Sequence, residues 1–226
     1  MDLSIALLNG SDPLFFRQPS EHMPKYPEKL LPGAGDKLGF QDNINLVGPI
    51  DDELSTAWRV MKRFCLLVNL GTQTQFLIDP EIIRETMASL MYRLLRMEFS
   101  HGSLDEVVRL GLLTFSHHVF LQWHDIKTPY YDFATTYRSH LLDIGLIDSA
   151  SPQLIVWLLV TAADSLFQIS EELWLEVSLR GYVGACNVKT WKGLQEMLKS
   201  FMWMSLLDEH RGKQVYDFLY TNGNGS

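Results

Sequence analysis

Apolar residues recur at helical spacing over most of the chain after Pro49. Between residues 79 and 97, for example, they return every three or four positions, as on the buried face of an amphipathic helix. No stretch alternates apolar and polar residues between hairpin turns, the pattern of a half-buried strand. The pattern predicts an all-α domain of about eight helices, packed as a compact bundle or array.

Start and stop signals divide this region into helices of roughly ten to twenty residues. Residues that favour helix starts precede the predicted segments, namely Asp51, Asp79, Ser103, Ser151, Ser170 and Thr190. Gly71 and Gly145 follow the last turns of two segments. Residues 107–123 and 153–167 are apolar nearly all round, which predicts two central helices.

The last two predicted helices cover residues 191–207 and roughly 212–220. The charged stretch Asp208 to Arg211 lies between them, so we expect one helix to stop and the next to start there. Asp208 is the expected cap, and Glu209 is expected in the first turn.

Residues 1–50 differ in composition from the rest of the chain, because they hold six of the nine prolines together with several glycines. Proline fixes φ and removes a hydrogen-bond donor, so long helices are not expected there. The predicted organisation is a Pro/Gly-rich extended arm over residues 1–50, followed by the helical domain over residues 51–226.

Composition and charge limit the classes of function that the chain can have. The formal charge of −8 argues against direct nucleic-acid binding, and the longest fully apolar run, Leu154 to Val160, is too short to span a membrane. Cys65 and Cys186 lie in apolar contexts and are expected to be free thiols of an intracellular protein, in the nucleus or cytoplasm. No nucleotide or cofactor fingerprint is present, so no cofactor is expected.

No metal site is expected either. His117 and His124 share a helical face but are seven residues apart, about 10 Å along a helix axis, which is too far for one zinc ion.

Asp164 is the residue that the apolar pattern does not explain. It lies in the apolar stretch LLVTAADSLF, where a carboxylate must find a partner, meet solvent or keep its proton. A structural hydrogen bond to a histidine or tryptophan N–H is one prediction. The other is an acid in an apolar pocket, with Asp164 and His118 as catalytic candidates and with Trp157, His117 and Trp203 as ligand-binding candidates.

Four stretches carry a resemblance to a known family: RLGLLTFSHHVFLQW, SPQLIVWLLVTAADSLF, ELWLEVSLRG and TWKGLQEMLKSFMWMSLLDEHRGKQVYDFL. In order and spacing they resemble the C-terminal half of the fungal-specific transcription factor domain, over about Asp51 to Leu219. The resemblance implies a helical fold, dimerisation or contact with another transcription factor, and sensing of a small molecule. The DNA-binding module of that family uses six cysteines, which two cysteines cannot supply, so DNA binding is not carried over.

Two functions follow as hypotheses. The first is a stand-alone regulatory module that acts by protein contact or by binding an apolar small molecule. The alternative is a cofactor-independent enzyme of fungal secondary metabolism, in which Asp164 and His118 promote cyclisation, isomerisation or dehydration by general acid–base catalysis. A truncated gene product without a function of its own is a third alternative.

Overall fold

The protein folds as an assembly of helices, with every regular element of the described residues helical. The structure, a computed structural model, describes residues 23–31, 43–121 and 131–221. In chain order its elements are η2 (Glu28–Leu30), η4 (Asn43–Leu46), α2 (Asp52–Thr74), α3 (Pro80–Arg96), α4 (Leu104–Phe120), α5 (Tyr131–Asp143), η5 (Ile144–Leu146), α6 (Pro152–Ser165), α7 (Leu173–Ala185), α8 (Trp191–Phe201) and α9 (Ser205–Thr221). The predicted all-α class is confirmed.

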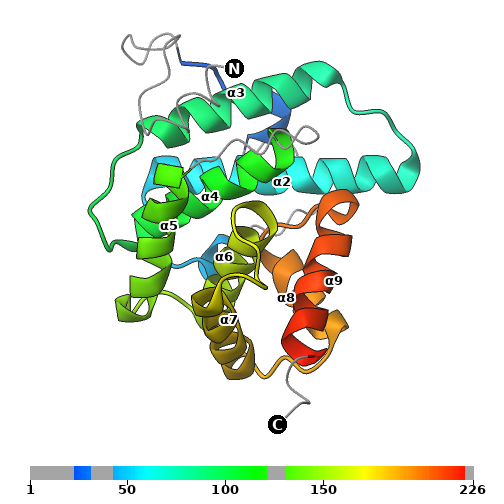
Figure 1. Ribbon diagram of the computed structural model, residues 1–226. Coiled ribbons are helices and arrows are strands. Elements are labelled where there is room, and N and C mark those ends of the chain that lie inside the picture. The colour runs from blue at the N-terminus through cyan, green and yellow to red at the C-terminus, as the bar shows by residue number, and fades with distance from the viewer. Residues whose placement is uncertain (1–22, 32–42, 122–130, 222–226) are drawn as a thin grey trace.

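Helices α4 and α6 form the centre, as their all-round apolar pattern predicted. Helices α2 and α3 pack along one side of α4, and α7, α8 and α9 pack around α6 (Figure 1). The central pair approaches closely at Gly111, where a Cβ atom would lie 2.3 Å from Leu158 Cδ2. A glycine in the middle of α4 therefore lets the two helices touch.

Most helices start at the residues that the sequence indicated. Side chains at the predicted starts accept hydrogen bonds from backbone N–H groups of the first turn at Asp51, Asp79, Ser103, Ser151 and Thr190. Each bond satisfies a donor that has no partner within the helix. The prediction for Ser170 is wrong, because α7 begins at Leu173. Ser170 lies in the turn before the helix, which the Glu171 N–H closes by donating to the carbonyl oxygen of Gln168.

The prediction that Gly71 follows the end of its helix is wrong as well. Helix α2 runs on to Thr74 and ends at Gln75, which has a left-handed φ of 56°. The chain then folds back onto the helix, and a Cβ atom at Gly71 would lie 2.9 Å from the carbonyl oxygen of Phe76. Gly71 therefore makes room for the returning chain.

The break between the last two helices lies earlier than predicted. Helix α8 ends at Phe201, an extended link covers residues 202–204, and α9 already begins at Ser205. Asp208 to Arg211 therefore belong to the first turns of α9. The link is possible because its backbone groups find partners on distant helices, which local patterning does not reveal.

Parts of the predicted N-terminal arm lie outside the described residues, and the described parts pack against the helices. Leu30 and Val47 are fully buried, and the Arg63 guanidinium donates to the carbonyl oxygen of Leu31. Arg93 lies 4.8 Å from the ring centre of Tyr26. Among the helices described, none has the length and apolar character needed to cross a membrane.

Candidate functional site

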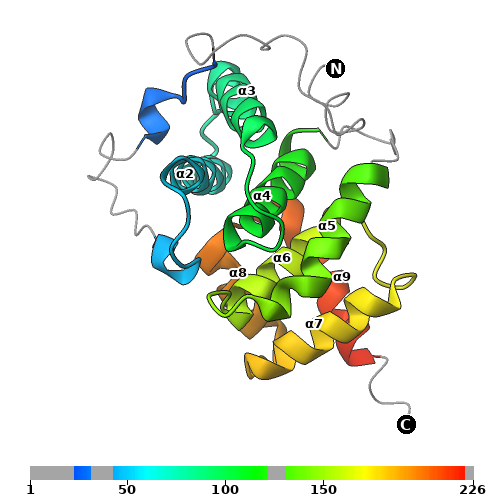
Figure 2. The ribbon, with the colours of Figure 1, turned by 90° about the vertical axis from the view of Figure 1, so that its left-hand side faces the viewer.

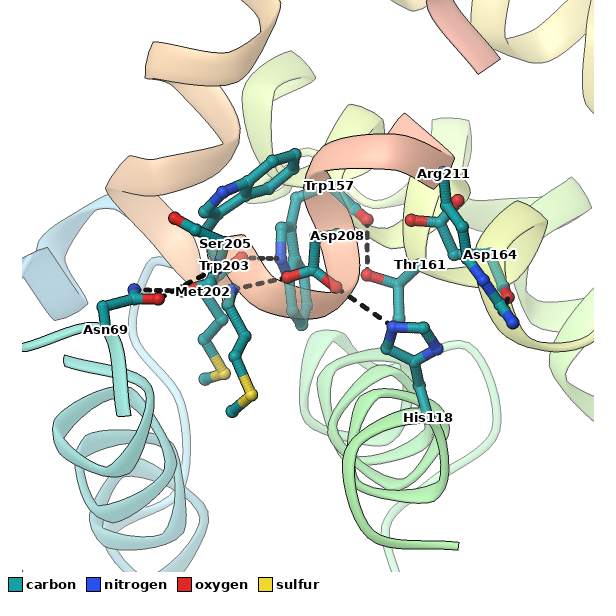
Figure 3. Close-up of polar contacts among 11 residues, drawn as sticks. Asn69, His118, Trp157, Thr161, Asp164, Met202, Trp203, Ser205, Asp208 and Arg211 are labelled. Carbon is teal, nitrogen blue, oxygen red and sulfur yellow. Dashed lines mark hydrogen bonds and ion pairs between the residues drawn. The ribbon is translucent and has the colours of Figure 1, made fainter. Parts of the chain in front are cut away.

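The link between α8 and α9 is buried and is held by side chains from two other helices. Trp157 of α6 donates from Nε1 to the carbonyl oxygen of Met202 at 3.1 Å (Figure 3). Asn69 of α2 donates to the carbonyl oxygen of Trp203 at 2.8 Å and accepts from the N–H of Ser205 at 2.9 Å. Backbone groups that would be costly to bury unpaired are thus satisfied.

Asp208 completes this arrangement from the first turns of α9. One carboxylate oxygen accepts from the backbone N–H of Met204 at 2.5 Å, and the other lies 3.0 Å from His118 Nε2 of α4. Both side chains are almost fully buried, with exposed fractions of 4% for His118 and 5% for Asp208. A buried carboxylate needs such partners, and here they join α4, α9 and the link.

Sequence reasoning placed Asp208 as a helix cap and missed its partner His118. Asp208 lies within α9, and its side chain accepts from the N–H of Met204, four residues earlier. A cap was expected instead at the residue that precedes the helix. The run of apolar residues before Asp208 was the available signal that it is buried. His118 was named above as a catalytic candidate, but nothing in the sequence indicated that it contacts Asp208, 90 residues away.

Asp164 lies at the C-terminal end of α6, with a half-buried side chain. Burial raises the pKa of its carboxyl group, the nearby Asp208 raises it further, and Arg211 opposes both. The Arg211 guanidinium donates to the backbone carbonyl of Asp164. No donor among the described residues hydrogen-bonds the carboxylate. The histidine and tryptophan nearest to it have other partners, since His118 Nε2 contacts Asp208 and Trp157 Nε1 donates to Met202 O.

Four of the five predicted site residues surround one small cavity, which Asp208 also lines: Asp164, His118, Trp157 and Trp203. Its volume is about 10 Å³, which is room for about one water molecule. The fifth, His117, is buried but is not among the lining residues. Burial, together with neighbouring His118, lowers the pKa of His117 to about 4. The arrangement can hold a water molecule between two carboxyl groups, but it leaves no room for a substrate.

A larger cavity of about 260 Å³ lies on the other side of the link, against α2. Its apolar wall consists of Cys65, Leu66, Phe201, Met202 and Trp203, and its polar residues are Lys62, Asn69, Gln73, Lys199 and Ser205. Both charged residues of the lining are lysines. The side chain of Lys62 is buried and donates to the carbonyl oxygen of Ser200, whereas Lys199 is exposed at the rim.

Trp203 is the predicted ligand-binding residue that reaches this larger cavity. It is 5% exposed, and its indole N–H finds no acceptor among the described residues. Burial raises the pKa of the neighbouring Cys65 thiol, Asp208 adds to the rise, and Lys62 opposes it, so this cysteine is a neutral wall residue. Sequence reasoning missed Lys62 and Lys199 as residues of this cavity, and the stretch around Lys62, which also holds Arg59 and Arg63, gave no clear signal.

In the described part of the chain, no cluster of three or more His, Cys, Asp or Glu residues is arranged to hold a metal ion. His124, considered above with His117, lies outside the described residues. Comparison with known proteins gives no match to a family model, to a curated protein or to a solved structure.

Proposed function

We propose that this protein is a regulatory module, similar to a fungal transcription factor domain, that acts by binding and not by direct contact with DNA. The four motif stretches support the regulatory part of the proposal. The observation that carries the binding part is the cavity of about 260 Å³ beside the α8–α9 link. This volume is just below the range of roughly 300–1,000 Å³ that small-molecule sites occupy.

The chemistry of the cavity favours a small molecule with an apolar body and one anionic group. Phe201, Met202 and Trp203 supply an apolar wall, and Lys62 and Lys199 supply two positive charges. No acid is among the described lining residues, although the chain as a whole carries a formal charge of −8. A carboxylate at the lysines with its aliphatic chain against Trp203 satisfies both features.

The position of the cavity connects binding to the packing of the helices. Asn69 and Trp203 line it, and the hydrogen bonds of Asn69 hold the link between α8 and α9. A ligand that prefers one arrangement of the link shifts the population of the chain toward it. Ligand binding is thereby coupled to the position of α9.

The proposal is tested by titrating the full chain with decanoate and, as an uncharged comparison, with methyl decanoate. Decanoate is expected to stabilise the protein in thermal unfolding by about 2.7 kcal/mol at a hundredfold excess over its dissociation constant. The ester is expected to stabilise it less, because it cannot pair with the lysines.

A matched pair of variants localises the effect. Lys199→Ala is expected to weaken decanoate binding by roughly tenfold, the effect of removing one charge-assisted contact. Lys192→Ala removes an 83% exposed lysine from the same helix and is expected to leave binding unchanged. Equal effects of the two variants, or no stabilisation by decanoate, contradict the ligand-binding proposal.

The acid–base enzyme is the alternative, and one observation favours it. The pKa of Asp164 is raised, and this carboxyl group lies at a cavity that His118 also lines. Against it stand the small volume of that cavity and the engagement of His118 with Asp208. We therefore assign the function to binding.

A further inference from the structure

Helix α7 presents an apolar face to solvent. Leu175, Leu179 and Val183 are buried against the core, while on the opposite side Leu173 is 73% exposed and Val177 is 61% exposed. The same outer face continues through Gly181, Gly184 and Ala185, which are exposed too. Exposed apolar residues gathered on one helix face, without a charged side chain among them, make that face a candidate for interaction.

Helix α5 lies beside α7 (Figure 2). Arg138 of α5 pairs with Glu172 at 3.4 Å and lies 5.2 Å from the ring centre of Trp174. Further along both helices, a Cβ atom on Gly145 would lie 3.0 Å from the hydroxyl oxygen of Tyr182. The two segments therefore run side by side in the same direction.

Two exposed leucines belong to this neighbouring segment. Leu142, which is 54% exposed, follows Arg138 by four residues and so shares its helical face, and Leu146, which is 82% exposed, follows Gly145. We call the combined surface the α5–α7 face; its members are Leu142, Leu146, Leu173, Val177, Gly181, Gly184 and Ala185.

The α5–α7 face is complementary to itself. Its bulky residues, Leu173 and Val177, lie in the N-terminal half of α7, and its small residues, from Gly181 onward, lie in the C-terminal half. When two copies of α7 pack antiparallel about a twofold axis, Val177 of each copy meets Gly181 of the other. Leu173 likewise meets Ala185, so bulky side chains fill the places that small residues leave open.

Charge at the two ends of α7 fits the same arrangement. The exposed Glu171 precedes the helix and the exposed Lys189 follows it, so antiparallel pairing brings opposite charges together at both ends. The helix dipoles are opposed as well. A stable interface buries about 1,600 Å² in total, and the exposed Leu142 and Leu146 add apolar area to that of α7.

We propose that the α5–α7 face binds a second copy of this chain through antiparallel pairing of the two α7 helices. The inference goes beyond the proposed ligand binding and is independent of the ligand. A strict monomer that still binds decanoate overturns this inference alone, and a dimer that ignores decanoate overturns the ligand proposal alone.

The test is sedimentation velocity of the full chain over a concentration series. The wild-type protein is expected to form a dimer, and Val177→Arg is expected to weaken its association by at least roughly thirtyfold, since it places a charge at the centre of the interface. The matched control is Leu77→Arg, at a residue that is 89% exposed in the α2–α3 connection. Circular dichroism checks that both variants fold.

Two results overturn the proposal. One is a wild-type chain that stays monomeric over the whole series, which includes the case in which the face serves a different protein. The other is a dimer that Val177→Arg and Leu77→Arg affect equally.

Disulfide cross-linking tests the register. The background is Cys186→Ser, with the buried Cys65 left in place. A mixture of Val177→Cys and Gly181→Cys chains is expected to cross-link faster than either alone, since residues four apart are offset by about 6 Å along the helix. A Cβ atom at Gly181 meets nothing within 4 Å, so the cysteine is tolerated. Faster cross-linking of Val177→Cys with itself overturns the antiparallel arrangement.

Discussion

Asp208 joins three parts of the molecule through a single carboxyl group. It accepts from the N–H of Met204 in the link, contacts His118 on α4 and belongs itself to α9. A carboxylate that is 5% exposed is tolerated only when its oxygens are partnered, as they are here. The charged stretch at residues 208–211 therefore divides by side-chain burial, since Asp208 is buried and Glu209, His210 and Arg211 are exposed.

Replacing Asp208 with alanine is expected to lower the free energy of unfolding by about 2–4 kcal/mol. The physical reason is that the Met204 N–H loses its acceptor while it stays buried, and His118 Nε2 loses its contact with the carboxylate. Urea unfolding measures the change. Glu209→Ala, which removes an exposed carboxylate that accepts from Gln195, is the control and is expected to change stability by no more than about 1 kcal/mol. Similar losses for both variants would contradict the assigned role of Asp208.

His117 makes stability depend on pH. Its pKa is lowered to about 4 in the folded protein, whereas an unfolded histidine titrates near about 6.5. Between these values the unfolded chain binds the proton first, so the free energy of unfolding falls as pH decreases from about 6.5 to about 4. The shift sets this contribution at up to about 3 kcal/mol.

The contribution of His117 is measured by chemical unfolding at several pH values. In His117→Gln the group is absent, so the decrease of stability with falling pH is expected to be shallower than in the wild type. The comparison of slopes is not affected by the pH-independent cost of a buried substitution. Asp164 titrates in both proteins and cancels in the difference. Parallel curves would show that His117 does not titrate as stated.

At the scale of the elements, the contact between α4 and α6 depends on one glycine. A Cβ atom at Gly111 would lie 2.3 Å from Leu158 Cδ2 and 3.3 Å from the hydroxyl oxygen of Tyr137. That hydroxyl donates to the carbonyl oxygen of Leu158, so the crowded place is also a hydrogen-bonded one. Tyr137 belongs to α5, so three helices meet at this point.

Gly111→Ala is expected to destabilise the protein by about 1–3 kcal/mol, because overpacking exceeds the gain in helix propensity. Gly181→Ala is the control: its Cβ atom meets nothing within 4 Å, and it is expected to stabilise α7 by about 0.5–1 kcal/mol. Thermal unfolding at low protein concentration, at which the chain is monomeric, measures both. A stabilising Gly111→Ala would contradict the close contact of α4 and α6.

The start of a helix was more predictable than its end. Asp79 with Pro80 and Ser103 with Glu106 are local signals, and both marked their helices correctly. The predicted boundary between the last two helices was wrong because the apolar run from Phe201 to Met204 fits a helical pattern as well as an extended one. Hydrogen bonds from Trp157 and Asn69 stabilise the extended conformation of the link, and both residues are remote from it in sequence.

At the scale of the whole molecule, the α8–α9 link is where distant segments meet. Asn69 and Lys62 of α2 hydrogen-bond backbone groups that are 134 to 138 residues away. The larger cavity lies between these same segments, so its lining consists of residues that are remote in sequence. The proposed ligand and the proposed second copy occupy separate surfaces, one at α2 and the link and the other at α5 and α7.

Periodicity, composition and capping residues were sufficient to determine the helical class, the two central helices and most helix starts, because these depend on neighbours within a few residues. Only the tertiary structure decided that His118 pairs with Asp208, that Asp164 borders a cavity for about one water molecule, and that Trp203 lines a larger cavity. It also decided which face of α7 stays exposed. The physical reason is that the partner of a buried polar group, and the cover over an apolar face, come from segments that only folding brings together.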